Sequence, residues 1–208
     1  MTKPTVVLTR RLPDAVVRAA MERFEVRNNL DDRRFSPGEM QVALRSADGI
    51  LCTLGDPLTV GVLGGGPWRT RILANFGAGT DHIDLAAAMA SGIVVTNTPG
   101  ALTEATADLA MALILMATRR LGEGERELRA GQWTGWRPTH LLGNSIQGKT
   151  LGIIGFGRIG QATARRAKLG FGMNILYAGR NEVGAPRKSI TTETTSDELD
   201  AKAVGLAE

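Results

Sequence analysis

Short runs of β-branched and apolar residues alternate with helix-like segments along the first hundred residues. The strand-like runs lie at residues 5–9, 49–53, 71–76 and 93–97. Apolar residues at helical spacing follow Pro13-Asp14, Ser36-Pro37 has the pattern of a capped helix start, and residues 85–90 predict a further helix. Strands that alternate with helices through short connections indicate parallel α/β winding.

The middle of the chain predicts a long helix over residues 103–120, rich in Ala, Leu and Met. Its apolar residues nearly encircle it, which is typical of a helix buried between domains or in a subunit interface, and also of an ordinary core helix. Residues 122–148 indicate another helix followed by an irregular segment with Trp133 and Trp136. The longest apolar run, residues 109–117, is about half of a membrane span, so we expect no association with a membrane.

The most specific motif is Gly-Phe-Gly-Arg-Ile-Gly at residues 155–160. It follows a compact apolar strand at 151–154 and opens a helical run, and a second strand at 173–177 follows that helix. This strand–helix–strand context is what a dinucleotide-binding turn requires, whereas an isolated G-x-G-x-x-G pattern is often accidental. A glycine-rich turn with a purely structural role is the alternative.

Each glycine of this turn has a physical task in a dinucleotide site. Gly155 permits the tight turn, Gly157 lets the backbone approach a pyrophosphate, and Gly160 lets the helix pack close to the strand. The exposed amides at the start of the helix, where Arg158 and Ile159 lie, would then hold the anion.

The end of the second strand bears on the choice of dinucleotide. An acidic residue there would accept hydrogen bonds from the ribose 2′-hydroxyl of NAD(H). The chain has no Asp or Glu between Gly155 and Arg180. The Arg180 guanidinium suits a 2′-phosphate, so NADP(H) is favoured over NAD(H), unless Arg180 is an ordinary turn residue.

Composition excludes several classes of protein. The 208 residues include 25 Lys and Arg against 21 Asp and Glu, but the basic residues are dispersed and only 4% of the chain is aromatic, which disfavours a nucleic-acid partner. The single cysteine, Cys52, cannot form an internal disulfide. With no signal-peptide pattern at the start, this favours the cytoplasm.

Several longer motifs, in this order, resemble the D-isomer-specific 2-hydroxyacid dehydrogenases, especially their glyoxylate/hydroxypyruvate reductase branch. They are Asn-Phe-Gly-Ala-Gly-Thr-Asp-His-Ile-Asp at 75–84, Asn-Thr-Pro-Gly-Ala-Leu-Thr-Glu-Ala-Thr-Ala-Asp at 97–108, Gly-Gln-Trp at 131–133 and the segment 148–160. The resemblance implies an α/β fold with a flavodoxin-like outer domain over residues 1–98. It also implies the first part of a Rossmann-type doubly wound dinucleotide-binding domain over residues 99–180, incomplete at the C-terminus, before a divergent tail at 181–208.

The same resemblance assigns roles to individual residues. Backbone amides of Gly77, Ala78 and Gly79 would bind the substrate carboxylate, a role that suits a glycine loop because it exposes amide donors. Thr103 would lie near the nicotinamide end of the cofactor, and a cap of the long helix is an equal alternative. The implied activity is NADPH-dependent reduction of a small 2-oxo acid, such as glyoxylate or hydroxypyruvate, to a 2-hydroxy acid, in a homodimer formed through the 103–120 helix region.

The resemblance also implies an arginine that polarises the carbonyl and a histidine–glutamate pair that supplies the proton, all located after the glycine turn. The only two histidines, His82 and His140, precede the turn, so no catalytic residue is assigned. We therefore expect a truncated chain that departs from the family near residue 181 by frameshift or gene decay, and that is unstable or folds only as an oligomer. An inactive dinucleotide-binding or oligomerising remnant is the alternative function, and a structural subunit that pairs with an intact paralogue is a third.

Overall fold

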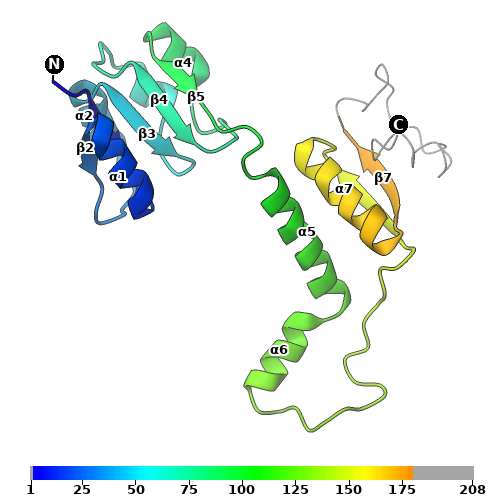
Figure 1. Ribbon diagram of the computed structural model, residues 1–208. Helices are drawn as coiled ribbons and strands as arrows, with labels where there is room; N and C mark the ends of the chain where they lie inside the picture. The colour runs from blue at the N-terminus through cyan, green and yellow to red at the C-terminus, as the bar shows by residue number, and fades with distance from the viewer. Residues whose placement is uncertain (1, 180–208) are drawn as a thin grey trace. The chain divides into compact units, whose positions relative to one another are not determined.

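The computed structural model describes residues 2–179 and divides the chain into two compact units, Met1–Ala101 and Leu102–Glu208 (Figure 1). The sequence placed the boundary between residues 98 and 99. Both units combine parallel strands with helices, which confirms the expected α/β class. Within the described residues, every helix is too short or too polar to cross a bilayer.

The first unit is built on a five-stranded sheet with the strand order β2-β1-β3-β4-β5. Every neighbouring pair of strands in it is parallel. This order is the flavodoxin-like one, as expected for the outer domain. The strands are β1 (Thr5–Leu8), β2 (Glu25–Asn28), β3 (Gly49–Thr53), β4 (Ile72–Phe76) and β5 (Val94–Thr96).

Four helices connect these strands: α1 (Asp14–Arg23), α2 (Pro37–Ser46), α3 (Val60–Leu63) and α4 (Leu85–Ala90). At the start of α2 the Ser36 hydroxyl accepts a hydrogen bond from the Glu39 N–H, and the Glu39 carboxylate accepts one from the Ser36 N–H. This capping box, with Pro37 in the first turn, is the helix start that the sequence predicts. The Asp84 carboxylate caps α4 by accepting from the Ala87 N–H at 2.8 Å.

The core of the first unit lies between the sheet and α2, α3 and α4, whereas α1 has no buried residue. It is formed by fully buried aliphatic side chains, among them Met40, Leu44, Ile50, Leu63 and Leu73. Their positions alternate along β3 and β4, as in a strand with one face toward helices. The carboxyl ends of the strands are thereby held together at one edge of the sheet.

The second unit contains α5 (Thr103–Thr118), α6 (Leu121–Arg129), β6 (Thr150–Ile154), α7 (Arg158–Phe171) and β7 (Asn174–Ala178). Strands β6 and β7 pair in parallel and α7 crosses between them, so the expected strand–helix–strand unit is present. Helix α5 packs on α7, and Arg166 joins the two helices by ion pairs with Glu104 at 2.8 Å and Asp108 at 2.6 Å. This polar clamp lies beside the apolar contact made by Met111.

As expected, one helix occupies most of residues 103–120 and a second helix follows it. Arg120, whose φ of 55° lies in the left-handed region, separates α5 from α6. Neither glycine nor proline marks this break. Only Ala107 and Met111 of α5 are buried, while Leu109, Leu113 and Met116 are exposed. Within the described residues α5 is therefore covered on one side only, unlike an ordinary core helix.

Candidate functional site

The glycine turn joins the carboxyl end of β6 to α7. Gly155 has a φ of +92°, a conformation that residues with a side chain rarely adopt, and its N–H donates to the Ala178 carbonyl of β7 at 2.7 Å. Gly157 is the N-cap of α7, and no side chain caps that helix. A Cβ on Gly157 would meet no atom within 4 Å, so the backbone is open to an approaching ligand.

Gly160 closes the other side of the turn. It is buried, and a Cβ there would overlap the Gly155 carbonyl oxygen and lie 3.3 Å from Cγ2 of Ile153 in β6. The buried Phe156 ring stacks on Tyr177 of β7, with the ring centroids 4.2 Å apart. Packing against both strands thus fixes the conformation of the turn.

The first amides of α7 are available to a ligand. Within the described residues, the N–H groups of Gly157, Arg158 and Ile159 donate no hydrogen bond. Unpaired amides at a helix N-terminus, together with the helix dipole, attract anions. The structure therefore brings Gly155, Gly157, Arg158, Ile159 and Gly160 together in one turn whose properties suit the pyrophosphate of a dinucleotide.

The two other cofactor candidates lie apart from this turn in the sequence. Thr103 is the first residue of α5, but Leu102 occupies the cap position and no side chain caps the helix. The capping alternative for Thr103 is therefore not observed. Arg180 lies outside the described residues, and the choice between NADP(H) and NAD(H) stays a prediction.

The candidate carboxylate loop follows β4 at the carboxyl edge of the first sheet. Gly77 is buried, whereas Ala78 and Gly79 are exposed. The carbonyl oxygens of these residues accept hydrogen bonds from side-chain amides: Asn75 Nδ2 donates to Gly77 and Gly79, and Asn97 Nδ2 donates to Ala78. The N–H groups of Ala78 and Gly79 donate to no described residue. The Gly77 N–H, which the resemblance also assigned to the carboxylate, instead donates to the Asn75 carbonyl oxygen at 2.9 Å, so that part of the expectation is wrong. Free amides on an exposed loop can bind a carboxylate.

Two side chains border this loop. A Cβ on Gly77 would lie 3.0 Å from Cδ2 of Leu54, the exposed residue that follows β3, so glycine allows the two segments to approach. A Cβ on Gly79 would lie 3.5 Å from the Asp81 Oδ2. The Asp81 carboxylate therefore opposes an anion at this loop, and the amide donors would have to outweigh it.

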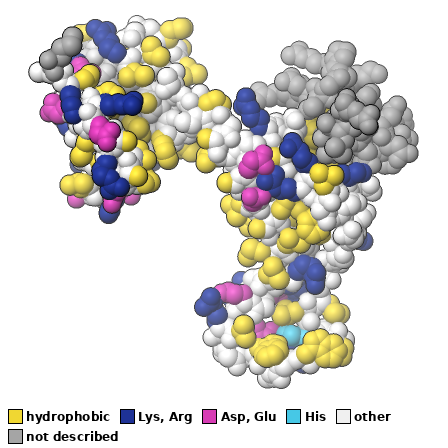
Figure 2. All heavy atoms as spheres, in the orientation of Figure 1, with side chains coloured by type: hydrophobic (Ala, Val, Ile, Leu, Met, Phe, Trp, Pro, Cys, Tyr) yellow, Lys and Arg dark blue, Asp and Glu magenta, His cyan; other side chains and the backbone are white. Residues whose placement is uncertain are grey.

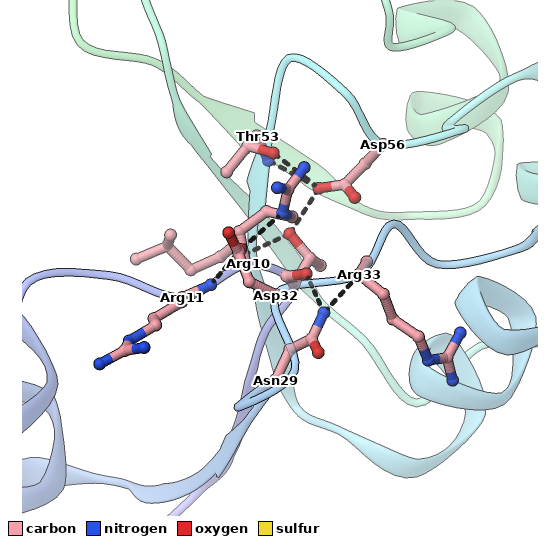
Figure 3. A network of polar contacts seen from close by, with 9 residues as sticks. Arg10, Arg11, Asn29, Asp32, Arg33, Thr53 and Asp56 are labelled. Carbon is pink, nitrogen blue, oxygen red and sulfur yellow. Dashed lines mark hydrogen bonds and ion pairs between the residues drawn. The ribbon is translucent and has the colours of Figure 1, made fainter.

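A second polar network ties together the carboxyl ends of β1, β2 and β3 (Figure 3). Oδ2 of the buried Asp56 accepts hydrogen bonds from the Thr9 hydroxyl at 2.5 Å and the Thr53 N–H at 2.7 Å. Arg10 forms an ion pair with Asp32 at 2.9 Å, and this hydrogen bond is the main cause that lowers the pKa of the Asp32 carboxyl. The network holds together the ends of these three strands, whereas the candidate carboxylate loop follows a fourth strand, β4.

The two histidines are not joined to either segment by a hydrogen bond among the described residues. His140 Nε2 lies 2.7 Å from Glu127 Oε2, and Arg137 lies 3.4 Å from the other oxygen of that carboxylate. His82 follows the loop, and its buried Nε2 has no partner in the described part of the chain. The absence of a catalytic residue from this chain stays a prediction.

Sequence reasoning did not identify Asn75 and Asn97, the two side chains that bind the loop carbonyls. Their signal was that each of the two motifs quoted for residues 75–84 and 97–108 begins with an asparagine, which lies near the end of β4 for Asn75 and directly after β5 for Asn97. The strand register explains why they meet, because Ala74 pairs with Thr96 and the next residue of each strand is the asparagine.

Comparison with known proteins agrees with both motif regions. Residues 111–203 match the D-isomer specific 2-hydroxyacid dehydrogenase NAD binding domain. The glyoxylate reductase of Thermococcus onnurineus is 40% identical over 195 residues, covering 92% of this chain and 58% of that protein. The glycerate dehydrogenase of Hyphomicrobium methylovorum is 39% identical over 201 residues, covering 97% of this chain and 62% of that protein.

A solved structure shows the same arrangement. The NADPH-dependent glyoxylate/hydroxypyruvate reductase from Sinorhizobium meliloti, in complex with NADP and malonate, aligns with a TM-score of 0.71 at 35% identity, over 91% of this chain and 56% of that one. The chain thus spans about three-fifths of the length of the relatives that it matches, 58% and 62% of the two reductase and dehydrogenase sequences. The glycine turn, the flavodoxin-like sheet and these alignments agree: residues 111–203 match the NAD binding domain of the D-isomer-specific 2-hydroxyacid dehydrogenases, and the chain is similar in sequence and fold to members of that family.

Proposed function

We propose that this chain binds NADP(H) at the glycine turn and a small 2-oxo acid at the Gly77–Gly79 loop, as part of a reductase that forms 2-hydroxy acids from glyoxylate or hydroxypyruvate. The observation that carries the proposal is that both segments expose backbone N–H groups without a partner among the described residues. The names of the relatives, glyoxylate reductase and glycerate dehydrogenase, support the substrate class.

In this proposal each residue of the glycine turn has a separate role in binding the cofactor. The amides of Gly157, Arg158 and Ile159 bind the pyrophosphate, and Gly160 keeps α7 close enough to β6 to aim them. Arg180 pairs with the 2′-phosphate, supported by the lack of Asp and Glu between Gly155 and Arg180 and by the NADP complex of the Sinorhizobium relative. Thr103 lies toward the nicotinamide end. When bound, the reduced nicotinamide would supply the hydride that adds to the substrate carbonyl carbon.

The Gly77–Gly79 loop orients the substrate. Its free amides bind the carboxylate, which fixes the position of the adjacent carbonyl carbon and limits the directions from which hydride can reach it. Proton donation and carbonyl polarisation are assigned to no described residue.

A catalytically inactive protein that binds dinucleotide or oligomerises is the second candidate function. It is favoured by the position of both histidines before the glycine turn and by the engagement of His140 with Glu127. One experiment separates the candidates: fluorescence titration with NADPH and with NADH, followed by absorbance at 340 nm after addition of glyoxylate or hydroxypyruvate. Turnover supports the reductase, and binding without turnover supports the inactive dinucleotide-binding protein. Failure to bind either nucleotide contradicts both of these and leaves only the oligomerising form.

We also propose that the protein is a homodimer formed through α5. Leu109, Leu113 and Met116 are 59%, 55% and 45% exposed and follow one another at helical spacing along one face. Figure 2 shows hydrophobic side chains gathered over the region of α5 and α6. A hollow between α5 and α7, lined in part by Leu115 and Leu169, extends this apolar surface.

We further propose that the protein is located in the cytoplasm, where the buried thiol of its single cysteine, Cys52, stays reduced.

A further inference from the structure

We infer that Asn75 and Asn97 are positioning residues, which turn the amide groups of the Gly77–Gly79 loop toward the substrate carboxylate. The inference rests on the proposed role of this loop in binding the substrate. It goes further by naming the side chains that give the loop its direction, and these chains need not touch the substrate themselves.

The geometry of the peptide unit links the direction of each carbonyl group to that of the next N–H group. In a trans peptide the C=O of one residue and the N–H of the next are coplanar and point in opposite directions. Gly66–Pro67 is the only cis bond among the described residues, so the units of this loop are trans. A side chain that holds the carbonyl of Gly77 therefore also directs the N–H of Ala78, and the same holds for Ala78 with Gly79 and for Gly79 with Thr80.

Each of these carbonyls is held by an asparagine. Asn75 Nδ2 donates to the Gly77 oxygen at 3.1 Å and to the Gly79 oxygen at 2.8 Å. Asn97 Nδ2 donates to the Ala78 oxygen at 2.7 Å. Three successive peptide units thus have their oxygens tied to the domain, and these ties set the orientation of the whole loop.

The opposite ends of the same peptide units are free. The N–H groups of Ala78, Gly79 and Thr80 donate to no described residue, although the Thr98 N–H adds a further bond to the Gly77 oxygen at 3.0 Å. A run of bound carbonyls and unbound amides is the arrangement of an anion-binding concavity. A hydrogen bond to a carbonyl also polarises its peptide unit and strengthens the N–H as a donor. Positioning and activation therefore come from the same contacts.

The Asn75 side chain is oriented for donation alone. It is 3% exposed, and its Oδ1 is buried without a partner in the described part of the chain. Rotation of the amide by half a turn would place Oδ1 against the two carbonyl oxygens that Nδ2 now binds. An unsatisfied buried acceptor destabilises a fold, so the retention of this one is explained by the two bonds that Nδ2 makes.

Asn29 provides a matched control in the same unit. Its Nδ2 also bridges two carbonyl oxygens, those of Thr9 at 2.7 Å and Arg33 at 2.6 Å, but on the loop shown in Figure 3 and not on the candidate carboxylate loop. Asn29→Ala therefore removes the same kind of double clamp without changing the direction of the Ala78 and Gly79 amides. Alanine is used throughout, because aspartate would add a charge that itself repels an anion.

The test uses the full chain labelled with ¹⁵N, with malonate and glyoxylate as probes. In the unmodified chain we expect both probes to shift the amide resonances of Ala78, Gly79 and Thr80. Asn97 is exposed, so Asn97→Ala should leave the thermal unfolding temperature unchanged while weakening probe affinity about tenfold, as expected for the loss of one or two oriented hydrogen bonds. Asn75→Ala should weaken affinity further and also lower stability, whereas Asn29→Ala should lower stability alone.

The outcomes distinguish this inference from the proposed function. If the probes bind without shifting these amides, or bind nowhere, the proposed role of the loop is wrong. If they shift these amides but Asn97→Ala and Asn75→Ala bind them as tightly as the unmodified chain, the loop binds carboxylates and the positioning role is wrong. Equal loss of affinity in Asn29→Ala would show that general destabilisation, and not loop direction, is responsible.

Discussion

Gly160 in α7 lies directly against the carbonyl oxygen of Gly155, so closely that a Cβ on Gly160 would overlap that oxygen. The contact is between the backbone of two parts of one turn, and the Cγ2 methyl of Ile153 in β6 lies beside it, so the helix and the strand approach closely only because residue 160 has no side chain. The amides at the start of α7 are aimed by this approach, because the helix axis cannot shift while the contact is kept.

Gly160→Ala should therefore disrupt the turn. We expect a loss of about 1–3 kcal/mol in the free energy of unfolding from overpacking, together with loss of NADPH binding. Gly170→Ala is the control in the same helix, because a Cβ there would meet no atom within 4 Å. It should leave binding unchanged and raise stability by about 0.5–1 kcal/mol. Thermal unfolding and NADPH fluorescence report both effects, and a Gly160→Ala chain that still binds NADPH normally would contradict this account.

Cys52 should be unreactive in the folded chain. Burial, and secondarily the charge of Asp56, raise the pKa of its thiol to about 12, so the reactive thiolate is nearly absent at pH 8. We expect the disulfide reagent DTNB to label the native chain slowly and the urea-unfolded chain at once. Cys52 is the only cysteine, so the signal has one source. Rapid and complete labelling of the native chain would contradict the observed burial.

The same shift predicts how stability depends on alkaline pH. Because the folded state holds the Cys52 proton more tightly than the unfolded state, its contribution is fully present below the ordinary pKa of 9.0 and declines as the pH rises toward about 12. Urea unfolding between pH 8 and 11 should show a steeper loss of stability in the unmodified chain than in Cys52→Ala, which lacks the titrating thiol.

The capping box of α2 should contribute to the dependence of folding stability on acidic pH. Hydrogen bonds from Arg33, and then from the Ser36 backbone and hydroxyl, lower the pKa of the Glu39 carboxyl to about 2. A lowered pKa means that the contribution is present above the ordinary value of 4.5 and is lost as the pH falls from there toward 2. Acid unfolding followed by circular dichroism should therefore depend less on pH in this range for Glu39→Gln.

Ser36→Ala removes the second hydrogen bond of the capping box, the one that the Ser36 hydroxyl accepts, and its effect can be measured at neutral pH. The Glu39 N–H loses its side-chain acceptor, and we expect a loss of about 1 kcal/mol in the free energy of unfolding. Ser46→Ala, at the opposite end of α2, is the control and should have a smaller effect. A neutral result for Ser36→Ala would show that the cap does not stabilise the helix.

Leu113→Glu tests the proposed dimer. A charge in the exposed apolar row of α5 should convert a dimer into monomers, because a carboxylate would be buried without a partner at the interface. Met89→Glu is the control, since Met89 on α4 is 77% exposed and lies outside this row. Sedimentation velocity reports the mass of each species. A monomeric unmodified chain, or a Leu113→Glu chain that remains dimeric, would contradict the proposal.

Elements with a strong local pattern were predictable from the sequence, and elements made by their neighbours were not. Strand β3 is found at Gly49–Thr53 as expected, because its apolar run with buried Ile50 and Cys52 is typical of a central strand in a parallel sheet. Strand β2, Glu-Val-Arg-Asn, lacks an apolar run, and its residues are exposed or half-buried. It is stabilised by backbone hydrogen bonds to β1, which a local sequence pattern does not reveal. The left-handed conformation of Arg120, between the two predicted helices, was not predictable, since a residue with positive φ is usually glycine.

The candidate site divides in the same way. The spacing of glycines predicts a backbone conformation without reference to any other residue, so Gly155, Gly157 and Gly160 were identified directly from the sequence. Asn75 and Asn97 act on carbonyl groups that only the folded chain brings to them, through the pairing of β4 with β5. The two motifs marked these asparagines as candidates, but their partners are backbone carbonyl groups, so the residue types alone did not identify the contact.

The strand order β2-β1-β3-β4-β5 has a consequence for how the first unit forms during synthesis. Once β1 and β2 have paired, β3 adds to the open edge of β1, and β4 and then β5 each add beside the strand that precedes them in the sequence. No strand has to insert between two that are already hydrogen-bonded. The sheet can therefore grow outward as the ribosome releases the chain, and because every parallel pairing joins residues far apart in the sequence, the formation of each pair is expected to limit the folding rate.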